Sequence, residues 1–481
     1  MSNIWDEKIF SGTYVAGAAG TLEVKAPATG EVIATIGHAD VTDLDNAVVA
    51  AKAAQPAWAA LPYTERAAVM TKAAALLAEN PERLTRWLVP ESGSGHGKAD
   101  FEAMLVTSEL QAGAALAAQP YGQMLRSMKP RVSIGRYVPV GVVGVISPFN
   151  FPAILSMRSV APALALGNAV VLKPDPRTSI SGGLALAELL AEAGLPEGLL
   201  HVLPAGAEVG AALVAHHDVP CISFTGSTAA GRKIGEAAGP LLKKVHLELG
   251  GNNALLVMPD ADIDAAASAG AWGSFLHQGQ ICMTTGRHLV PKDKVEEYAA
   301  KLAEKAEHLP VGDPTDPANA LGPIIDENQL KHVHSIVEET VAAGAKLLVG
   351  GTHEGLFYRP TVLADVPLDS PAFSQEIFGP VAPVVGYETL EEAVEIINSS
   401  EYGLSVAILT GNPFKAFELA ERIKSGAVHI NDQTVDDEAV APFGGTKASG
   451  VGGHFGTSVN LDTFCDVQWV TIQGDIERYP F

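Results

Sequence analysis

The chain has 481 residues, of which 47% are hydrophobic, and its formal net charge is −23. A chain of this length exceeds the roughly 250–300 residues that one hydrophobic core usually serves, so two or more domains are expected. The strong negative charge, with no basic stripe to offset it, argues against nucleic acid and anionic membrane surfaces as partners.

The cysteine content and the apolar runs indicate a reducing compartment. Cys221, Cys282 and Cys465 are the three cysteines, and none belongs to a C-x-x-C pair. An odd number in a long chain argues against a disulfide framework. The first residues lack a basic start followed by an apolar core, and no apolar run reaches the roughly 18–20 residues of a membrane helix. We therefore expect a cytoplasmic protein that has no contact with membranes.

The first 138 residues predict strands, then helices, then an exposed hairpin. Residues 1–40 alternate extended runs with turns, and apolar residues recur at helical spacing from 43 to 118. Residues 121–138 form an extended, locally basic segment. An edge hairpin leaves backbone groups unpaired unless another segment or subunit covers it. This segment is therefore either a subunit contact or a solvated hairpin.

Strands and helices alternate from residue 137 to residue 238. Helices separate apolar strands that are predicted at 137–147, 169–172, 199–203 and 221–224. Continuous apolar strands alternating with helices are typical of a parallel sheet covered on both faces. Ligands of such sheets bind at the carboxyl ends of the strands. The polar or glycine residues at those ends are Asn150, Lys173, Gly226 and Ser227.

The remainder of the chain predicts a second domain of the same class. Two strands at 244–258 are followed by a helix at 262–277 that leads into Cys282. The alternation of strands and helices then restarts, and the tail at 462–473 reads as a terminal strand. The fold class is therefore α/β, with two doubly wound parallel-sheet domains and a small β arm.

The segment from Phe224 to Gly231 follows a strand and opens a helix. A glycine-rich turn at such a point aims backbone N–H groups and the positive helix end at an anion such as pyrophosphate. The segment is not a Walker A loop, because Arg232 and Lys233 follow the last glycine, and no G-x-G-x-x-G motif occurs in the chain. A plain tight turn fits these residues equally well.

Three residues are candidates for covalent catalysis. Cys282 follows a glycine-containing turn and is either a nucleophile, which requires thiolate character, or a small buried apolar residue. Glu248 ends a strand and is either a general base or a solvated carboxylate. Asn150 lies between two prolines, where its amide could donate to an oxyanion, cap the following helix, or do both.

Other reaction classes lack their motifs. No H-E-x-x-H sequence occurs, and the 14 histidines do not cluster with cysteines at ligand spacing, so no metal site is expected. No G-x-S-x-G elbow occurs, which argues against a serine hydrolase.

Over essentially its whole length the chain resembles the aldehyde dehydrogenase superfamily. The shared motifs occupy Pro148–Pro152, Lys173-Pro174, Phe224–Thr228 with Gly231, Leu247–Gly251, Gly279–Cys282, Glu376–Pro380, and Pro442–Gly445 with Lys447, Ser449 and Gly450. Residues 154–160 and 173–178 look most like the benzaldehyde and vanillin dehydrogenase branch. The resemblance implies NAD(P)-dependent oxidation of an aldehyde, here an aromatic one, to its carboxylic acid.

The resemblance also implies residue roles. Cys282 would attack the aldehyde, its backbone N–H and Asn150 would hold the oxyanion, and Glu248 would activate the water that hydrolyses the thioester. The residues that would bind the cofactor are Ile146, Ser147, Pro148, Phe149, Lys173, Pro174, Asp175, Arg177, Gly206, Gly226, Ser227, Leu249, Glu376 and Phe378. Phe151 and Phe443 would be pocket walls, although aromatic residues at such positions are also often plain core.

The same resemblance implies the domain boundaries. A Rossmann-like, dinucleotide-binding domain would take residues 1–120 and 139–249, and a catalytic domain residues 250–446. An oligomerisation arm of residues 121–138 and 447–481 would make the protein a homodimer or homotetramer.

One departure from the family pattern concerns the cofactor. Many NAD-preferring members carry a glutamate three residues after the lysine, where this chain has Pro176. Arg177 could attract the 2′-phosphate of NADP, whereas Asp175 could take over the ribose hydroxyls. NAD is therefore expected, with NADP possible.

Arg158 and the reaction type leave alternatives open. Arg158 lies two helical turns after Asn150, where it could meet a polar ring substituent or form a surface salt bridge. A CoA-acylating semialdehyde dehydrogenase is disfavoured by the presence of Glu248. A non-catalytic protein on the same fold is disfavoured because none of the implied catalytic residues is missing.

Overall fold

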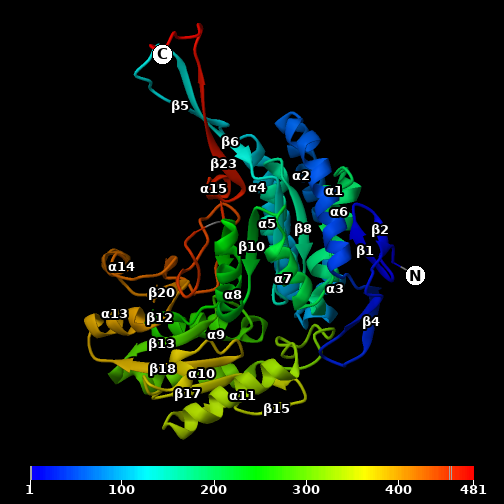
Figure 1. Cartoon of the computed structure of the whole chain (residues 1–481). Helices are drawn as coiled ribbons and strands as arrows, with labels where there is room; N and C mark the ends of the chain where they lie inside the picture. The colour runs from blue at the N-terminus through cyan, green and yellow to red at the C-terminus, as the bar shows by residue number, and fades with distance from the viewer. Residues whose placement is uncertain (1–2, 454, 457) are drawn as a thin grey trace.

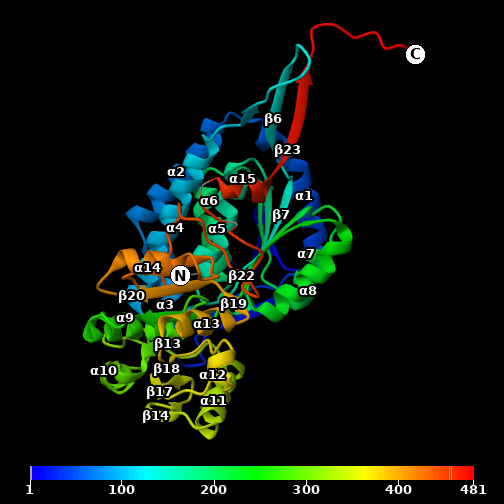
Figure 2. The same cartoon turned by 90° about the vertical axis from the view of Figure 1, so that its left-hand side faces the viewer.

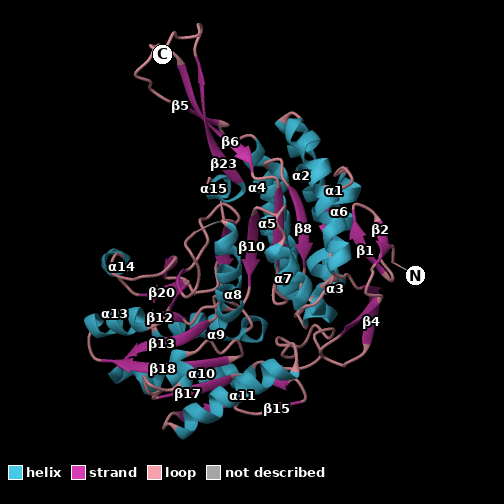
Figure 3. Cartoon of the chain, in the orientation of Figure 1, coloured by secondary structure: helices cyan, strands magenta, loops and turns pink. Residues whose placement is uncertain are grey.

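The computed structural model describes residues 3–453, 455–456 and 458–481. Two seven-stranded sheets flanked by helices make up the body, and a thin β arm that carries the C-terminus projects from it (Figures 1 and 3). The expected α/β class, with two parallel-sheet domains and a small arm, is confirmed. Among the described helices, none is long and apolar enough to cross a membrane.

The first sheet has the strand order β11-β10-β7-β8-β9-β1-β2. Its parallel strands are β7 (Val142–Ile146), β8 (Ala169–Lys173), β9 (Leu200–Val202), β10 (Cys221–Thr225) and β11 (Lys244–Glu248). The N-terminal strands β1 (Lys8–Ser11) and β2 (Tyr14–Ala16) extend its edge in the antiparallel sense. The sequence pattern did not predict this addition, because pairing between Phe10 and Val202 is non-local.

Helices cover both faces of this sheet. With the right-handed crossovers that are usual for parallel strands, this strand order puts α5 (Pro152–Ala165) and α6 (Ala185–Ala193) on one face, and α7 (Ala207–Ala215) and α8 (Thr228–Ala238) on the other. The N-terminal helices that pack around them are α1 (Val41–Ala60), α2 (Tyr63–Glu79), α3 (Glu82–Ser92) and α4 (His96–Ala117). Every residue of α5 is buried, so its side chains line the interior of the molecule.

The second sheet has the strand order β14-β17-β18-β13-β12-β20-β21. Its strands are β12 (Asn253–Val257), β13 (Thr285–Pro291), β14 (Lys346–Val349), β17 (Thr361–Ala364), β18 (Val381–Tyr387), β20 (Ser405–Leu409) and β21 (Ala427–Ile430), of which only β14 is antiparallel to its neighbour. Alternate residues of β12 enter different hydrophobic clusters, Ala254 and Leu256 one and Leu255 and Val257 the other. The sheet is therefore buried on both faces.

The helices of this second domain complete the two clusters. They are α9 (Ile263–Phe275), α10 (Val295–His308), α11 (Glu327–Ala342), α12 (Pro371–Ser374), α13 (Leu390–Ser399) and α14 (Pro413–Ala420). Residues of α9 and α10 belong to one cluster, and residues of α11, α13 and α14 to the other.

The arm is a three-stranded antiparallel sheet that extends away from the body (Figure 2). It contains β5 (Gly122–Met124), β6 (Val132–Pro139) and β23 (Cys465–Ile472), and the short helix α15 (Val459–Phe464) leads into it. Minor two-stranded pairs are β3 (Thr21–Lys25) with β4 (Val32–Gly37), β15 (His353–Glu354) with β16 (Phe357–Tyr358), and β19 (Tyr402–Gly403) with β22 (Thr446–Lys447).

Candidate active site

Cys282 lies on a loop whose backbone is fixed on both sides. The helix predicted at 262–277 ends earlier, at Phe275, because His277 and Gln278 adopt positive φ angles of 49° and 57°. Gly279 continues this left-handed turn, and a Cβ on it would lie 2.1 Å from the carbonyl oxygen of Gly379. The loop therefore lies against the backbone at Gly379 in a contact that only glycine allows.

Side chains then hold the segment that follows. The amide of Asn253 donates to the carbonyl oxygens of both Cys282 and Thr284 at 2.8 Å. The hydroxyl of Thr284 donates to the Gly279 carbonyl at 2.9 Å, which closes the loop on itself. Cys282 is thereby held by side-chain contacts just before β13.

Two cavities meet at Cys282. A cleft lies between the domains, and its lining includes Phe149, Ser227, Leu249, Glu376 and Phe378. A second, smaller cavity has mainly apolar walls and includes Phe151, Arg158 and Phe443. Asn150, Leu155 and Cys282 line both cavities. Cys282 therefore lies where the interdomain cleft meets a mainly apolar cavity.

Burial makes the Cys282 thiol a weak acid. Loss of water around the thiol, with the nearby carboxylates of Glu376 and Glu248, raises its pKa to about 12, while Arg158 works in the opposite direction. The thiol is consequently protonated at neutral pH, and attack by the sulfur requires that a group takes its proton.

Glu248 is buried at the end of β11, where its charge acts on the Cys282 thiol, and it lies outside the lining of either cavity. One carboxylate oxygen lies 3.2 Å from Nε2 of His246, and the other accepts the backbone N–H of Gly445 at 3.2 Å. Burial raises the pKa of Glu248 well above its ordinary value, while the Gly445 N–H and Arg158 oppose that shift. The alternative of a solvated carboxylate is wrong, and a buried carboxyl with a raised pKa has the property of a general base.

Asn150 follows β7, and its backbone is anchored from α4. The buried ammonium of Lys98 donates to the Asn150 carbonyl at 2.8 Å and pairs with Glu102. Glu102 in turn accepts the N–H groups of Ala153 and Ile154, which open α5. Glu102, rather than Asn150, therefore caps this helix, so the capping alternative is wrong, and Asn150 lines both the cleft and the apolar cavity.

The turn between β10 and α8 lies on the cleft. Gly226 and Ser227 line it, and the Ser227 hydroxyl accepts the N–H of Ala230 as the helix cap. A Cβ on Gly231 would lie 2.3 Å from the Leu249 side chain, so the helix start sits tightly against the strand end. The free N–H groups of the first turn give this edge of the cleft a positive potential that suits a phosphate.

Glu376 and Phe378 line the cleft from the second domain. The Glu376 carboxylate accepts the N–H of Gly251 at 2.9 Å, and a Cβ on Gly250 would lie 2.1 Å from its other oxygen. Burial raises the pKa of Glu376 to about 7. The Phe378 ring meets that of Phe149 edge-on at 5.9 Å, so residues of both domains touch across the cleft.

The other residues predicted to bind the cofactor lie near the ends of the first sheet's strands. They are Ile146 and Ser147 at the end of β7, Pro148 in the cleft lining, Lys173 and Pro174 at the end of β8, and Gly206, which precedes α7. The Lys173 ammonium is buried and donates to the Pro174 carbonyl, and burial lowers its pKa.

Arg177 is already engaged by two carboxylates. Its guanidinium bonds Asp175 at 2.8 and 2.9 Å, and it also pairs with Asp326 in the second domain. The Arg177 group stacks 4.2 Å from the ring centre of Phe149. The arginine therefore joins the domains beside the cleft instead of pointing freely into it.

Arg158 is buried with only 3% of its surface exposed, so the expected surface salt bridge is wrong. Its guanidinium pairs with Asp437 and Glu109 and lies over the rings of Phe443 and Phe455, at 4.6 and 5.3 Å. The structure thus brings Arg158 to the apolar cavity beside Cys282.

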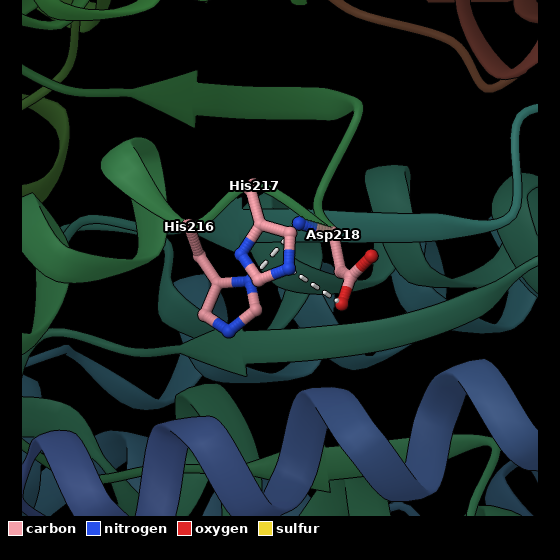
Figure 4. Close-up of side chains that lie close together, drawn as sticks. All are labelled: His216, His217 and Asp218. Atoms are coloured by element: carbon pink, nitrogen blue, oxygen red, sulfur yellow. Dashed lines mark hydrogen bonds and ion pairs between the residues drawn. The ribbon is translucent and has the colours of Figure 1, made fainter.

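A group of possible metal ligands lies elsewhere, on the loop between α7 and β10. His216, His217 and Asp218 place ligand atoms within 4.8 Å of one another (Figure 4). Asp218 is paired with Lys52, and the N–H of Asp218 donates to Nδ1 of His216 at 3.1 Å. Asp218 and His216 therefore already use possible ligand atoms in other contacts. None of the three residues belongs to the lining of the cleft.

Sequence reasoning did not identify Lys98, Glu102, His246 and Asp437. Lys98 and Glu102 are four residues apart on α4, which is a common spacing for a surface ion pair. Their contact with the loop at Asn150 depends on how α4 packs against α5, for which no local sequence signal exists.

Comparisons with known proteins agree with this geometry. A model of the aldehyde dehydrogenase family matches residues 14–470. A vanillin dehydrogenase of an Amycolatopsis species is 55% identical, with 99% of this chain and 98% of the relative aligned. A benzaldehyde dehydrogenase [NAD(+)] of Pseudomonas putida is 48% identical over the same shares of the two chains.

Solved structures show the same fold. A salicylaldehyde dehydrogenase from Pseudomonas putida, complexed with salicylaldehyde, superposes with a TM-score of 0.95 at 34% identity, covering 98% of this chain and 99% of the other. A betaine aldehyde dehydrogenase from Staphylococcus aureus in complex with NAD+ has a TM-score of 0.95 at 28% identity, covering 98% and 96%.

Proposed function

The chain belongs to the aldehyde dehydrogenase family, and we propose that it oxidises aromatic aldehydes to carboxylic acids with NAD through a thioester on Cys282. The observation that carries the proposal is the position of Cys282 between an interdomain cleft and an apolar cavity. The similarity to vanillin and benzaldehyde dehydrogenases supports the aromatic substrate. An aromatic aldehyde fits the apolar walls of the second cavity, among them Phe151 and Phe443.

In the proposed reaction the chain's own groups handle charge and protons. The Cys282 sulfur attacks the carbonyl carbon after losing its proton, and the Asn150 amide with the Cys282 backbone N–H holds the developing oxyanion. A bound nicotinamide supplies the hydride acceptor. Glu248 then takes a proton from the water that attacks the thioester, which releases the carboxylic acid and restores the thiol.

The residues around the cleft fit NAD. The first turn of α8 offers N–H groups for the pyrophosphate, and the close approach at Gly250 leaves room only for backbone beside Glu376. Lys173 and Glu376 would hold the two ribose groups, with Phe378 beside the nicotinamide.

The direct test is turnover of benzaldehyde or vanillin with NAD, followed by the absorbance of the reduced cofactor and by chromatography of the acid. An aliphatic aldehyde such as propanal serves as the comparison. The proposal requires a higher kcat/KM for the aromatic aldehydes, and oxidation of propanal alone would disprove the aromatic assignment.

Arg177 predicts discrimination against NADP. The Arg177 guanidinium pairs with the carboxylates of Asp175 and Asp326, which offset its attraction for a 2′-phosphate. The Asp175 carboxylate also repels such a phosphate. We expect Asp326→Asn to release Arg177 and to tighten NADP binding about tenfold, with NAD binding changed less than about twofold. Dissociation constants from quenching of tryptophan fluorescence measure both cofactors without turnover.

Glu327→Gln is the matched control, because Glu327 is the exposed neighbour and forms an ion pair with Lys331 at 3.5 Å. An equal change in the affinities for NAD and NADP in Asp326→Asn would show that the substitution alters the cleft as a whole and not the phosphate preference.

The arm supports an assembly of identical chains. On β23, Val467 and Trp469 point to one face of the arm and are 68% and 63% exposed. Exposed apolar side chains on an extended sheet edge are a typical subunit contact. We propose that this face pairs with a second copy, giving a homodimer or homotetramer.

Val467→Asp is expected to convert the assembly to single chains of about 50.0 kDa, since a charge would enter an apolar contact. Size-exclusion chromatography with light scattering gives the mass. Gln468→Asp adds the same charge on the opposite face, beside Arg136, and should leave the mass unchanged. Equal masses for wild type and Val467→Asp would contradict the proposed contact.

A further inference from the structure

A chain of hydrogen bonds leads from the proposed general base into the first domain. His246 and Glu248 are alternate residues of β11, so their side chains point to the same face of the sheet. Nε2 of His246 lies 3.2 Å from a carboxylate oxygen of Glu248. Nδ1 of the same ring lies 2.9 Å from the Ser223 hydroxyl on β10, which in turn lies 2.9 Å from the Ser159 hydroxyl on α5. The chain therefore ties Glu248 to three separate elements of the fold.

The members of this chain are shielded from water and held in place. His246 and Glu248 are each 2% exposed, and Ser223 and Ser159 are each 1% exposed. The parallel pairing of β10 with β11 puts Ser223 directly beside His246. The ring of Phe455 meets the imidazole at 72°, with the ring centres 4.2 Å apart. Strand pairing and packing thus fix the plane of the imidazole against the carboxyl group of Glu248.

The ionised form of Glu248 determines where the protons of the chain lie. A carboxylate only accepts hydrogen bonds, so Nε2 of His246 carries a proton and donates it. Nδ1 of the neutral ring then accepts from the Ser223 hydroxyl, and Ser223 can accept from Ser159. Each of these bonds therefore has one donor and one acceptor when Glu248 is charged, which is the form that a general base needs.

The bond from His246 favours this charged form. Burial raises the pKa of Glu248, and the Gly445 N–H opposes the shift from the other carboxylate oxygen. A bond from the Nε2–H of His246 acts in the same direction as that of Gly445, because a donor binds a carboxylate more strongly than a neutral carboxyl group. Loss of the imidazole donor would therefore raise the pKa of Glu248 further.

We propose that His246 is a positioning residue of the reaction, which favours the ionised form of Glu248 by donating its Nε2–H to the carboxylate, and that Ser223 fixes the tautomer this requires. The inference rests on the proposed function, because it assumes that Glu248 activates the water that hydrolyses the thioester. The imidazole acts only as a donor and takes no part in the bond changes at the thioester.

The test compares His246→Leu, which removes the donor, with His246→Gln, whose side-chain amide can still donate. The acyl-enzyme is formed in one burst of reduced cofactor, and release of the acid is followed by rapid quenching at a series of pH values. In His246→Leu we expect the midpoint of the profile to rise by about one pH unit. Deacylation should then be about tenfold slower below the midpoint but within about twofold of the wild type on the high-pH plateau. In His246→Gln the midpoint should move by less than about 0.3 unit.

Ser223→Ala provides a second variant that leaves the imidazole in place. It removes the donor to Nδ1, so the tautomer with a proton on Nε2 is no longer enforced, and the midpoint should rise by about half a pH unit. This variant decides the question if His246→Leu does not melt cooperatively. His201→Leu is the matched control, because His201 is also buried, contacts the Ser11 hydroxyl at 2.9 Å, and lies on β9 of the same sheet, away from β11. It should leave the midpoint unchanged.

Other charged groups near Glu248 are the same in all of these proteins. Arg158 lowers the pKa of Glu248, and Lys244, on the same face of β11, pairs with Asp466 at 2.9 Å. Cys282 is esterified while deacylation is measured, so titration of its thiol does not enter the profile. The carboxylates that pair with Arg158 are Glu109 and Asp437.

Infrared spectroscopy measures the ionisation of Glu248 without turnover. The C=O stretch of its protonated carboxyl group is assigned by its absence in Glu248→Gln, and it should persist to higher pH in His246→Leu than in the wild type. Equal slowing of deacylation at every pH, or an unmoved midpoint, would overturn the proposal and make His246 a core residue only. Failure of the wild type to oxidise any aldehyde would instead disprove the proposed function, and the infrared titration would still test the bond from His246 to Glu248.

Discussion

Cys282→Ala is expected to reduce aldehyde oxidation by roughly 10⁴–10⁶-fold, since removal of a covalent nucleophile leaves only binding and polarisation of the substrate. The binding of NAD should remain, because the pyrophosphate and ribose positions do not involve the sulfur. Steady-state formation of reduced cofactor measures the first effect, and fluorescence titration measures the second. Cys465→Ala makes the same change at a buried position in the arm and should retain activity.

The rate at which the Cys282 thiol is alkylated should depend on pH. Burial raises the pKa of Cys282 to about 12, so the thiolate is scarce at neutral pH and becomes more abundant as the pH rises. Alkylation by iodoacetamide without cofactor should therefore accelerate about tenfold per pH unit between about pH 7 and 10. Cys221 and Cys465 are buried and should label slowly. A rate that is constant over this range would show that Cys282 is already a thiolate.

Glu248→Gln is expected to stop the reaction at the thioester. Glutamine can keep the contact with the Gly445 N–H but cannot accept a proton from water. We expect one equivalent of reduced cofactor per site in a rapid burst, followed by turnover that is slower by about 10²–10⁴-fold. Mass spectrometry of the protein after the burst should show the acyl group on Cys282.

The wild type should show the corresponding pH dependence. A base acts only when deprotonated, and burial raises the Glu248 pKa, so deacylation should quicken as the pH rises through that pKa. This rise should be absent in Glu248→Gln and present in Glu236→Gln, a change at an exposed position of α8. A slow variant that shows no burst would place Glu248 before hydride transfer, as the group that activates the thiol.

Much of the fold could be predicted because it is encoded locally. Apolar runs separated by helical periodicity predicted both parallel sheets, and the tail predicted at 462–473 is β23, Cys465–Ile472. The left-handed turn at His277 and Gln278 could not be predicted, because neither is glycine and their side chains contact residues remote in sequence, Phe151 and Gly93. The pairing of β1 with β9 depends on contacts that are equally remote in sequence.

Some features of the candidate site could likewise be predicted from the sequence, and others could not. The positions of Cys282, Asn150 and Glu376 at strand ends and turns follow from motifs, and the structure brings all three to one cleft. The surroundings of these residues were not predictable. The environment of Arg158 depends on Glu109 from α4 and Asp437 from a distant loop. Their catalytic and binding roles remain predictions until the variants are measured.

The ion pair of Lys98 and Glu102 beneath Asn150 limits how this sequence can evolve. Loss of either partner would leave an unpaired charge in the interior, which costs about 3–5 kcal/mol of stability. This is a large share of the roughly 5–15 kcal/mol that keeps a domain folded. A lineage that changes one codon at a time would therefore pass through a poorly folded ancestor. The two positions should change together across generations or not at all, although neither takes part in the chemistry.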